Sequence, residues 1–593
     1  MNRPITPAEM VEGTTPMRRQ FHSHDGTKLS FLHWPASRMR RGAVIMVHRG
    51  HEHGERLAHV VDEAGLHAFD VYALDMRGHG ASGGPRGGGM RFDQIVRDLD
   101  CFAGHLRNRD GIALHDTAII GQSVGAVVAA AWVHDYGPPI RAMVLAAPAF
   151  DVRLYVPFAE TGIRQAVRAA PRLRIKSYVT GRMLTADRDR AASYRSDDRI
   201  TRGIPARLLI DLRDTARRIV ADAAMIDIPT QVLIAGDDRV VAQGPIETFC
   251  NALTSTRSER QLYPDLKHDL LGERDRAPVM ADLSRFIDDA FAAPAGPVCL
   301  LDADKAGPGR EEADRLASPP PSWSMAALRW RAMRAAIGVG ARLSQGMAIG
   351  RDAGFDSGAA LDYVYRKEAA GLGPIGRMVD RIYLEAPGWQ GIRQRRRHLE
   401  DLIAVALSRL EAEGMPRHIL DIAAGHGRYV LGLPPELLER VDTIHLRDYC
   451  ERNVAAGRAR LNEAGLGKKA RFEKGDAFDG DDLAALRPRP TLAIVSGLYE
   501  LYDTNGPVRS SLDGLSRAVP EGGYLLYTNQ PWHPQLEFIA RALTSHRGGR
   551  PWVMRRRSQA EMDQLVAAAG FEKLTQRIDR LGIFTVSLAR RLG

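Results

Sequence analysis

Residues 117–136 read TAIIGQSVGAVVAAAWVHDY, which is an apolar run, a turn of small residues and a second, longer apolar stretch. The turn has the form Gly-x-Ser-x-Gly, with Ser123 at its centre. Small residues on both sides let the chain turn sharply between a strand and a helix, so the serine hydroxyl stands at the helix N-terminus. The pattern predicts a nucleophilic serine; the alternative is a glycine-rich turn that holds an incidental serine.

A serine hydroxyl becomes a good nucleophile only when a base takes its proton and an acid orients that base. The apolar run QVLIA at 231–235 leads into Gly-Asp-Asp, which places Asp237 and Asp238 just past a predicted strand. His268 comes later and also follows a predicted strand. The chain order serine, aspartate, histidine is the order of the α/β hydrolases, so these residues predict a catalytic triad.

Short apolar runs alternate with longer helical patterns along the whole chain. Unbroken apolar strands separated by helices are typical of a parallel sheet covered on both faces, whose chemistry gathers at the carboxyl ends of its strands. We therefore expect an α/β protein. The expected strands lie at 43–47, 70–74, 117–120, 142–146 and 231–235 in the first half, and at 418–422, 443–446, 491–495 and 523–528 in the second.

The 593 residues of the chain are enough for two or three domains. The stretch 292–323 is rich in proline, glycine and charge, and it includes three consecutive prolines. Because proline fixes the backbone and supplies no amide donor, we expect this stretch to be an exposed linker. The predicted domains are 1–291, with a cap at about 149–229, and 324–593, which begins with a helical extension.

Several classes of protein are disfavoured by composition. The four cysteines stand far apart without a CxxC pair, which argues against a zinc knuckle, an iron–sulfur cluster or a disulfide framework and fits a reducing cytosol. Residues 1–13 lack the apolar core of a signal peptide, and no run reaches the ~18 apolar residues of a membrane span. We expect a cytoplasmic location, with peripheral contact at the inner membrane face as a further hypothesis.

Four separate motifs in the first half occur together in one known family. They are DMRGHGAS at 75–82, the serine turn, Gly-x-Asp at 236–238 and HDLLGE at 268–273. On these motifs, residues from about 20 to about 290 resemble the serine hydrolases of the monoacylglycerol lipase and lysophospholipase group. The resemblance implies an α/β-hydrolase fold with a cap insertion and a triad of Ser123, Asp238 and His268. It favours Asp238 over Asp237 as the acid.

One segment departs from that family. Where the group carries His-Gly before its oxyanion residue, this chain reads His48-Arg49-Gly50. An oxyanion hole needs backbone amides rather than particular side chains, so we expect one amide from Val124 and the other from Gly50 or Arg49. The histidines of this segment (His48, His51 and His53) are interpreted as shaping the loop rather than binding a metal, and no metal is expected.

The expected cap carries much of the positive charge of the chain. Residues 153–218 contain sixteen Arg or Lys against seven Asp or Glu, while the whole chain has a net charge of +10. One interpretation is solvated helix faces; the other is a surface that attracts anionic lipid head groups, where each cation contributes ~1 kcal/mol. Aromatic stacking residues are sparse there and no binding motif is visible, so nucleic acid is not expected as a partner.

The second half has a glycine turn after its first strand. The turn reads Asp421-Ile422-Ala423-Ala424-Gly425-His426-Gly427, and a dinucleotide-binding fold would show a similar one. Asp448 follows the next strand, where a carboxylate can bind ribose hydroxyls, and Asp476 follows another, where it would receive an adenine amino group. Two acidic groups at successive strand ends, without a basic group for a diphosphate, favour a nucleoside with a cationic sulfonium over NAD.

Together these features resemble the class I methyltransferases that depend on S-adenosylmethionine, although Ala423 replaces the first glycine of the usual pattern. SGLYELY at 496–502, NQPWHPQ at 529–535 and WVMRRR at 552–557 narrow the resemblance to a bacterial methyltransferase family often fused to such a hydrolase. The likeness covers most of 325–593 and implies a Rossmann-like fold. It implies cofactor contacts from Asp421, Ala423, Gly425, Gly427, Asp448, Asp476 and Ala477.

Methyl transfer needs an aligned acceptor and, for some acceptors, a base. Tyr499, Glu500 and His533 follow predicted strands and are candidates for the acceptor site, although each would also suit a structural role. The arginine clusters at 393–397 and 555–557 would hold an anionic acceptor, but a solvated helix face is the favoured interpretation of each.

The leading hypothesis is a bifunctional enzyme with a small-molecule or lipid substrate. The first domain would hydrolyse an ester, with an acyl-chain ester as the suggested substrate, and the second would transfer a methyl group from S-adenosylmethionine. Two alternatives remain: a lipase or lysophospholipase whose second domain only binds the cofactor as a sensor or is inactive, and a membrane-surface scaffold with two vestigial sites.

Overall fold

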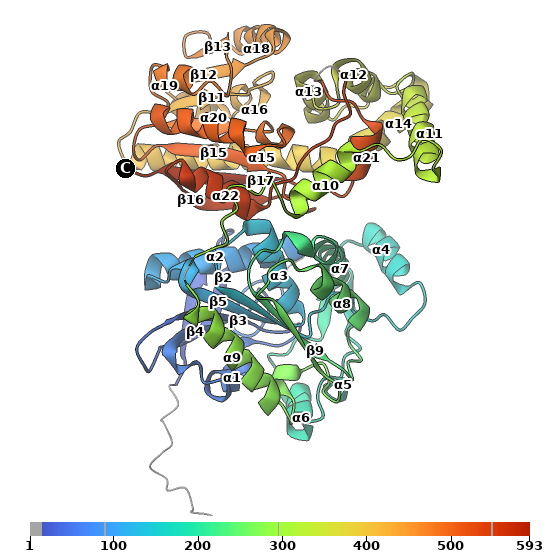
Figure 1. The fold of residues 1–593 in the computed structure, drawn as a ribbon, viewed down its shortest axis with the longest axis vertical. Helices are drawn as coiled ribbons and strands as arrows, with labels where there is room; N and C mark the ends of the chain where they lie inside the picture. Colours follow the sequence, from blue (N-terminus) through green and yellow to red (C-terminus); the bar gives the residue numbers. More distant parts are fainter. Residues whose placement is uncertain (1–14, 88–90, 295, 547–548) are drawn as a thin grey trace, which may run out of the picture. The chain divides into compact units, whose positions relative to one another are not determined.

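The computed structural model describes residues 15–87, 91–294, 296–546 and 549–593. The chain divides into two compact units, an N-terminal unit that ends at Val298 and a C-terminal unit that begins at Cys299 (Figure 1). Residues 1–13, on which the signal-peptide prediction rests, lie outside the described residues.

The N-terminal unit is built on an eight-stranded sheet in the order β1-β2-β4-β3-β5-β6-β9-β10. β1 and β2 pair antiparallel, whereas the strands from β4 to β10 run parallel. Buried runs of Val, Ile, Leu and Ala form the central strands, as the sequence predicts for a sheet covered on both faces. The strands are β1 (Met17–His22), β2 (Lys28–Trp34), β3 (Gly42–Val47), β4 (Phe69–Leu74), β5 (Thr117–Gln122), β6 (Ala142–Ala146), β9 (Thr230–Ala235) and β10 (Glu259–Tyr263).

Helices complete the N-terminal unit, and the insertion expected as a cap lies between β6 and β9. The helix that follows β5 is apolar all round and buried from Gly125 to Tyr136, which makes it a core helix. The core helices are α1 (Ala58–Glu63), α2 (Phe92–Asp110), α3 (Val124–Tyr136), α8 (Gln243–Ala252) and α9 (Ala277–Ala292). The cap consists of α4 (Ala159–Ala169), β7 (Arg174–Lys176), α5 (Gly181–Leu184), α6 (Arg188–Ser196), β8 (Gly203–Pro205) and α7 (Ala206–Ala221).

The C-terminal unit holds a seven-stranded sheet in the order β13-β12-β11-β14-β15-β17-β16. Five strands are parallel, and β17 runs antiparallel to β15 and β16. The α/β class expected from the sequence is therefore confirmed. So are the two expected architectures, an α/β-hydrolase fold in the N-terminal unit and a Rossmann-like fold in the C-terminal unit. The strands are β11 (His418–Asp421), β12 (Thr443–Asp448), β13 (Ala470–Lys474), β14 (Leu492–Val495), β15 (Tyr524–Asn529), β16 (Phe571–Ile578) and β17 (Thr585–Arg591).

Two apolar layers cover this sheet. One is formed with the long helix α15 (Pro387–Ala412), and the other with α19 (Gly480–Ala485), α20 (Asn505–Ala518) and α22 (Gln559–Ala568). No helix in the described part of the chain has both the length and the apolar character to cross a bilayer. The remaining helices are α11 (Met325–Gly340), α12 (Gln345–Ala353), α13 (Gly358–Arg366), α14 (Gly373–Leu384), α16 (Arg428–Leu431), α17 (Pro435–Arg440), α18 (Glu451–Glu463) and α21 (Leu536–Ala542).

The expectation of an exposed linker at 292–323 is wrong for most of that stretch. The boundary between the units lies at residues 298 and 299, and α10 (Pro308–Ala317) then packs against the C-terminal unit through buried Leu316. Arg556 of the C-terminal unit forms an ion pair with Glu312 of the same helix. The prolines therefore flank a docked helix, because proline is well tolerated in the first turn of a helix and just past its end.

Candidate active sites

Ser123 stands at a strained turn between β5 and α3. Its backbone has φ +54° and ψ −112°, a conformation that a residue with a side chain adopts only when its surroundings enforce it. The neighbouring glycines leave no room for side chains: a Cβ on Gly125 would lie 2.3 Å from the carbonyl oxygen of Val47. The close packing of strand and helix thus fixes the serine at the carboxyl end of the sheet.

The structure brings the three predicted triad residues together. Ser123 Oγ lies 2.7 Å from His268 Nε2, and His268 Nδ1 lies 2.7 Å from Asp238 Oδ2. All three side chains are buried. Asp237 is instead partly exposed and lies 3.5 Å from Arg239, so the alternative acid is not in the triad.

Asp238 is held as a carboxylate that orients the imidazole. Its second oxygen accepts hydrogen bonds from the amides of Val240 and Val241, at 2.7 and 3.0 Å. Burial alone would raise the pKa of this carboxyl, but the His268 imidazole and the two amides hold it below its ordinary value. The ionised acid therefore fixes His268 with Nδ1 protonated and Nε2 free to accept the proton of the serine.

The segment expected to complete an oxyanion hole lies beside the serine. A Cβ on Gly50 would lie 3.0 Å from a methyl group of Val124, so the backbones of these two residues are close neighbours. The Arg49 side chain, which replaces a glycine of the resembled family, pairs with Glu52 and lies 3.6 Å from Asp269. Arg49 and Gly50 line the cavity at Ser123, together with Val124.

A buried ionic cluster ties the cap to the triad, and the sequence analysis missed it. Asp269, next to His268, accepts hydrogen bonds from Gln122 at 2.7 Å and from Arg190 of cap helix α6 at 2.6 Å. Its pKa is held low, because Arg190 and Arg49 outweigh the cost of burial. The only sequence signal for this cluster was the aspartate in the motif HDLLGE.

The three histidines of the 48–53 segment have separate partners. His48 donates to the Arg49 carbonyl, His51 donates to the Thr201 carbonyl, and His53 bonds to Asp197, each at 2.7 or 2.8 Å. Thr201 and Asp197 belong to the cap, so these hydrogen bonds connect the 48–53 segment of the core to the cap. Among the residues that the structure describes, no group of three or more His, Cys, Asp or Glu is placed to hold a metal ion.

A cavity of about 310 Å³ opens at Ser123 and His268. Its walls come largely from apolar cap side chains, including Leu154, Ile163 and Ile175. Lys176, Ser177 and Tyr178 of the cap also line it, but most of the lining is apolar, so the cavity suits an ester whose remainder is apolar.

The predicted cofactor residues of the C-terminal unit meet at the carboxyl ends of β11, β12 and β13. Gly425 and Gly427 both have positive φ, and a Cβ on Gly425 would meet only Gly358, at 3.9 Å. Asp448 Oδ2 accepts a hydrogen bond from the Gly425 amide at 2.8 Å. The glycine turn and the acidic end of the next strand are therefore directly joined beside open space.

The remaining predicted cofactor residues differ in exposure. Asp476 is exposed and Ala477 is buried, whereas Ala423 is partly exposed. Asp421 is fully buried, bonded to the Tyr429 hydroxyl and the Ala423 amide, and burial raises its pKa to about 7. Through its bond to the Ala423 amide, Asp421 thus fixes the start of the glycine turn.

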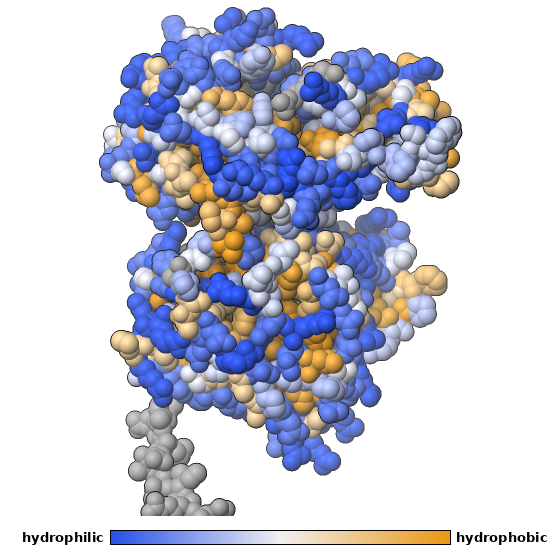
Figure 2. Space-filling view, in the orientation of Figure 1, coloured by the Kyte–Doolittle hydropathy of each residue, from blue (hydrophilic) through white to orange (hydrophobic). Residues whose placement is uncertain are grey.

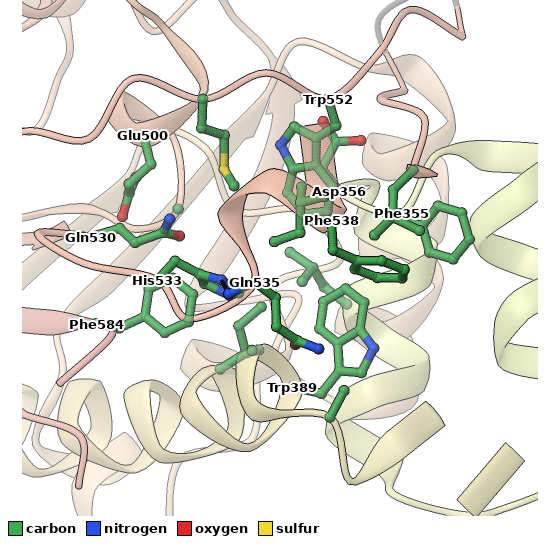
Figure 3. Close-up of a pocket in the computed structure, with 18 of the residues that line it drawn as sticks. Phe355, Asp356, Trp389, Glu500, Gln530, His533, Gln535, Phe538, Trp552 and Phe584 are labelled. Atoms are coloured by element: carbon green, nitrogen blue, oxygen red, sulfur yellow. Dashed lines mark hydrogen bonds between the residues drawn. The ribbon is translucent and has the colours of Figure 1, made fainter. Parts of the chain in front are cut away.

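A second cavity, of about 240 Å³, lies near these strand ends within the C-terminal unit. Figure 3 shows Glu500, Gln530 and His533 on one side of it, while Phe355, Phe538 and Trp552 lie on the other. Aromatic and aliphatic groups make up most of its lining. The cavity is therefore largely apolar: Glu500, Gln530 and His533 are grouped on one side, and Asp356 is the acidic group among the aromatic side chains.

Glu500 is the acidic group on the side of Gln530 and His533. One carboxylate oxygen accepts a hydrogen bond from Thr528 at 2.7 Å, and Thr528 in turn accepts one from the Gly497 amide. The other oxygen of Glu500 is buried without a partner. A buried carboxylate oxygen without a donor is costly, so this atom is suited to receive a hydrogen from a bound molecule.

His533 lies beside Glu500 in the cavity wall but is not a base in this state. Its Nδ1 accepts a hydrogen bond from the Gln535 amide at 3.0 Å, which places the proton on Nε2. Burial, together with the Arg556 charge, lowers its pKa to about 3. A Cβ on Gly388 would lie 2.9 Å from Nε2, so the glycine makes room for this donor.

Two expectations for this unit need correction. Tyr499 does not line the cavity: it is buried in the core, and its hydroxyl donates to Ser511 at 2.9 Å. The arginines 555–557 do not form a solvated helix face, because all three are buried. Arg557 bonds the carbonyls of Tyr499, Tyr502 and Thr504, so it anchors the loop that carries Glu500.

The cluster at 393–397 also divides in a way that the sequence did not show. Arg397 is exposed, whereas Arg395 is buried over the ring of Phe584 and lines the cavity. Its Nε atom has no hydrogen-bond partner. The sequence analysis missed the aromatic side chains of the cavity, which come from distant parts of the chain.

Comparison with known families agrees with this geometry. A family profile described as "Putative methyltransferase" matches residues 283–591, more than half of the chain. The chain belongs to this methyltransferase family. A second profile, described as "Serine aminopeptidase, S33", matches residues 38–275. The expected fusion is confirmed, and the two units are a hydrolase half and a methyltransferase half.

Relatives match either nearly the whole chain or its hydrolase half. The chain is 47% identical to "Uncharacterized protein YnbC" of Escherichia coli K12, over 98% of this chain and all of that protein. The hydrolase half is similar to a monoacylglycerol lipase of Mycolicibacterium smegmatis, at 26% identity over 46% of this chain and 98% of the lipase. A solved monoglyceride lipase of Saccharomyces cerevisiae is 20% identical, with a TM-score of 0.43, over 47% of this chain and 97% of its own.

Proposed function

We propose that the chain is a bifunctional enzyme. The hydrolase half cleaves an ester with an apolar acyl chain, and the methyltransferase half transfers a methyl group from S-adenosylmethionine to an acceptor in the second cavity. The observation that carries the hydrolase proposal is the hydrogen-bonded chain Ser123–His268–Asp238 at the end of an apolar cavity.

In the hydrolase half, Ser123 Oγ attacks the ester carbonyl carbon while His268 Nε2 takes the hydroxyl proton. The amides of Val124 and of Gly50 or Arg49 stabilise the negative oxygen that develops. His268 then gives its proton to the leaving alcohol, which departs and leaves an acyl-serine. Water, deprotonated by His268, releases the acid and restores the serine.

A fluorophosphonate probe tests this assignment. The intact chain should be labelled, and Ser123→Ala should not be. Asp237→Asn serves as the matched control, because that carboxylate lies outside the triad and its loss should leave labelling intact. Labelling that persists in Ser123→Ala would contradict the proposal.

The strand ends of the methyltransferase half fit S-adenosylmethionine. Asp448 and exposed Asp476 would bind the ribose hydroxyls and the adenine amino group, and the open backbone at Gly425 permits close approach of the nucleoside. When bound, the cofactor supplies an electrophilic methyl group. Arg428 and Arg460 pair with Asp362 of α13, which keeps the helical extension over this turn.

The second cavity would position the acceptor. The unpartnered oxygen of Glu500 accepts the proton that an acceptor hydroxyl or amine loses as its oxygen or nitrogen gains the methyl group. His533 Nε2–H donates to the acceptor rather than taking its proton. A cavity with a base in its wall favours catalysis over the alternative in which this half only senses the cofactor.

Calorimetry tests cofactor binding: the intact chain should bind S-adenosylmethionine, and Asp448→Ala should bind at least ~10-fold more weakly. Incubation with a labelled methyl donor and a total lipid extract, followed by mass analysis, tests transfer. Binding without any labelled product from lipid or aqueous extracts would favour the sensor alternative.

Membrane contact through the cap stays a proposal. Tyr155, Val156 and Phe158 are exposed before α4, which supports such a contact. Many cap arginines are paired within the unit, however: Arg164 and Arg217 both pair with Glu160. The attraction of the cap for an anionic surface is therefore weaker than the sequence count suggests.

A further inference from the structure

Helix α14 presents an apolar stripe to solvent. Leu372, which precedes the helix, and Ile375, Met378 and Ile382 within it are 59–73% exposed. Their spacing of three or four residues places them on one face. The opposite face holds Gly376 and Asp380, and buried Asp380 bonds Ser344 and Tyr363. Tyr383 and Leu384 of the same helix are buried in the core as well, so α14 packs apolar side chains inward and leaves the other apolar stripe exposed to solvent.

Positive charge surrounds this apolar face. Helix α14 carries Arg377 and Arg381, both exposed, and its single acidic residue is the buried Asp380. The stretch 325–351, which includes α11, contains five arginines and no acidic residue. Met325, Leu328 and Val339 of α11 are also more than half exposed. Exposed Asp352 and Glu385 flank these elements, but the arginines outnumber them, and apolar side chains with an excess of arginine match an anionic lipid surface.

The same helices form part of the wall of the second cavity. Ile382 of α14 lines the cavity while remaining 65% exposed, and Ile337 of α11 lines it as well. The turn after α11 is joined to the residue before α14, where the Leu372 amide donates to the Leu343 carbonyl at 2.8 Å. Ile382 therefore belongs both to the exposed stripe of α14 and to the lining of the cavity that holds Glu500. Figure 2 shows hydrophobic side chains among hydrophilic ones on the C-terminal unit.

We propose that the surface formed by α11 and α14 docks on an anionic bilayer and that the methyl acceptor is a membrane amphiphile. Its apolar chain would pass Ile382 into the aromatic part of the cavity, and its hydroxyl or amine would meet Glu500. This inference rests on the proposed methyl transfer for the acceptor, but not for the docking. A water-soluble acceptor would give no reason for an apolar helix face at the cavity mouth.

Vesicle flotation of the full chain tests the docking without any methyl donor. The chain should float with vesicles of phosphatidylcholine and phosphatidylglycerol, and much less with phosphatidylcholine alone. The double variant Ile375→Glu/Met378→Glu should bind the mixed vesicles at least ~10-fold more weakly. Both side chains are exposed, so the variant should keep the thermal unfolding of the parent.

Leu592→Glu is the matched control, because Leu592 is an exposed apolar residue of the same unit outside these helices. It should bind vesicles as the parent does. Hydrogen exchange locates the contact: peptides that cover 325–340 and 372–384 should gain protection on mixed vesicles. Protection confined to the cap loop at 154–158, or unchanged binding of the double variant, would overturn the docking proposal.

Two further outcomes separate the possibilities. A dimer that becomes a monomer in the double variant, with vesicle binding unchanged, would identify a second copy of the chain as the occupant and overturn the proposal. In the extract assay, labelled product in the aqueous fraction alone would overturn the amphiphile assignment. Absence of any product with intact flotation would instead count against the methyl transfer.

Discussion

The two cavities of this chain differ in how their polar groups are arranged. In the hydrolase half, Ser123, His268 and Asp238 bond one another, and no residue lining that cavity, within the described chain, has a buried polar side-chain atom without a partner. In the methyltransferase half, Glu500 and Arg395 each line the cavity with such an atom. Tyr383 and Trp552 do so too.

The difference follows from where the reactive group resides. A serine nucleophile is weak until a base and an acid are already bonded to it, so its site must be assembled before substrate binds. A methyltransferase takes its reactive group from the cofactor, so the protein needs to supply only a matched chamber and one proton acceptor. Unpartnered atoms in the second cavity are thus places for a ligand to bind.

The largest expected effect comes from the preassembled site. Ser123→Ala should lower ester hydrolysis by ~10⁴-fold or more, because no other group replaces the nucleophile. Methyl transfer should be unchanged, which parallel assays of both activities on one preparation would show. A matched loss of methyl transfer would mean that the two sites are not separate chemical units.

Glu500→Gln tests the proposed proton acceptor in the cavity of the methyltransferase half. Methyl transfer should fall ~10²-fold or more, because the amide keeps the Thr528 contact but cannot take a proton. Cofactor binding by calorimetry and hydrolysis should be unchanged. Tyr499→Phe is the control, since its hydroxyl bonds Ser511 in the core, and an equal loss of transfer in that variant would point to a structural effect.

A smaller effect is expected where the cap meets the triad. Arg190→Met removes the 2.6 Å bond from α6 to Asp269 and should lower kcat/KM for a long-chain ester about 10-fold. Exposed Arg188, on the same helix, serves for comparison as Arg188→Met, which should leave the rate unchanged. Steady-state kinetics with a short and a long ester check this. An equal kcat/KM in the two variants would show that this contact of the cap does not contribute to catalysis.

A separate prediction concerns how the stability of the folded chain depends on pH. Burial raises the pKa of Asp421 to about 7, so the folded chain keeps a proton that the unfolded chain releases near its ordinary pKa of 3.8. Stability therefore falls as pH rises from about 4 to about 7 and then levels off. Asp421→Asn should remove this part of the decline. Hydrogen exchange of β11 amides across that range measures it, and an identical decline in the variant would refute the assignment.

Much of the hydrolase site could be predicted because its signals are short. The serine turn, Gly-x-Asp and the His268 motif each lie within a few residues. The first two follow fully buried strands, whereas the strand before His268 is largely exposed; all three strands end at the same edge of the sheet. The cofactor turn at 421–427 could be found for the same reason. The antiparallel strands β1, β2, β16 and β17 were missed, since they lack unbroken apolar runs.

The cavity of the C-terminal unit could not be predicted, because its walls come from α11 to α15, the loop after β14 and the segment before α22. The arginines 555–557 read as a solvated cluster, yet each is buried against carbonyls or carboxylates that the fold brings to it. The docking of α10, within a stretch that reads as a linker, has the same cause: long-range packing has no local pattern.

The sequence by itself determined the two α/β halves, the triad and the acidic strand ends, because strand periodicity and turn chemistry act between near neighbours. Only the tertiary structure decided that Glu500 and not Tyr499 faces a chamber, that Asp269 joins the cap to the triad, and that α14 turns an apolar stripe outward. Those facts depend on which distant surfaces pack together, and burial sets the energy of a polar or apolar group only after that packing exists.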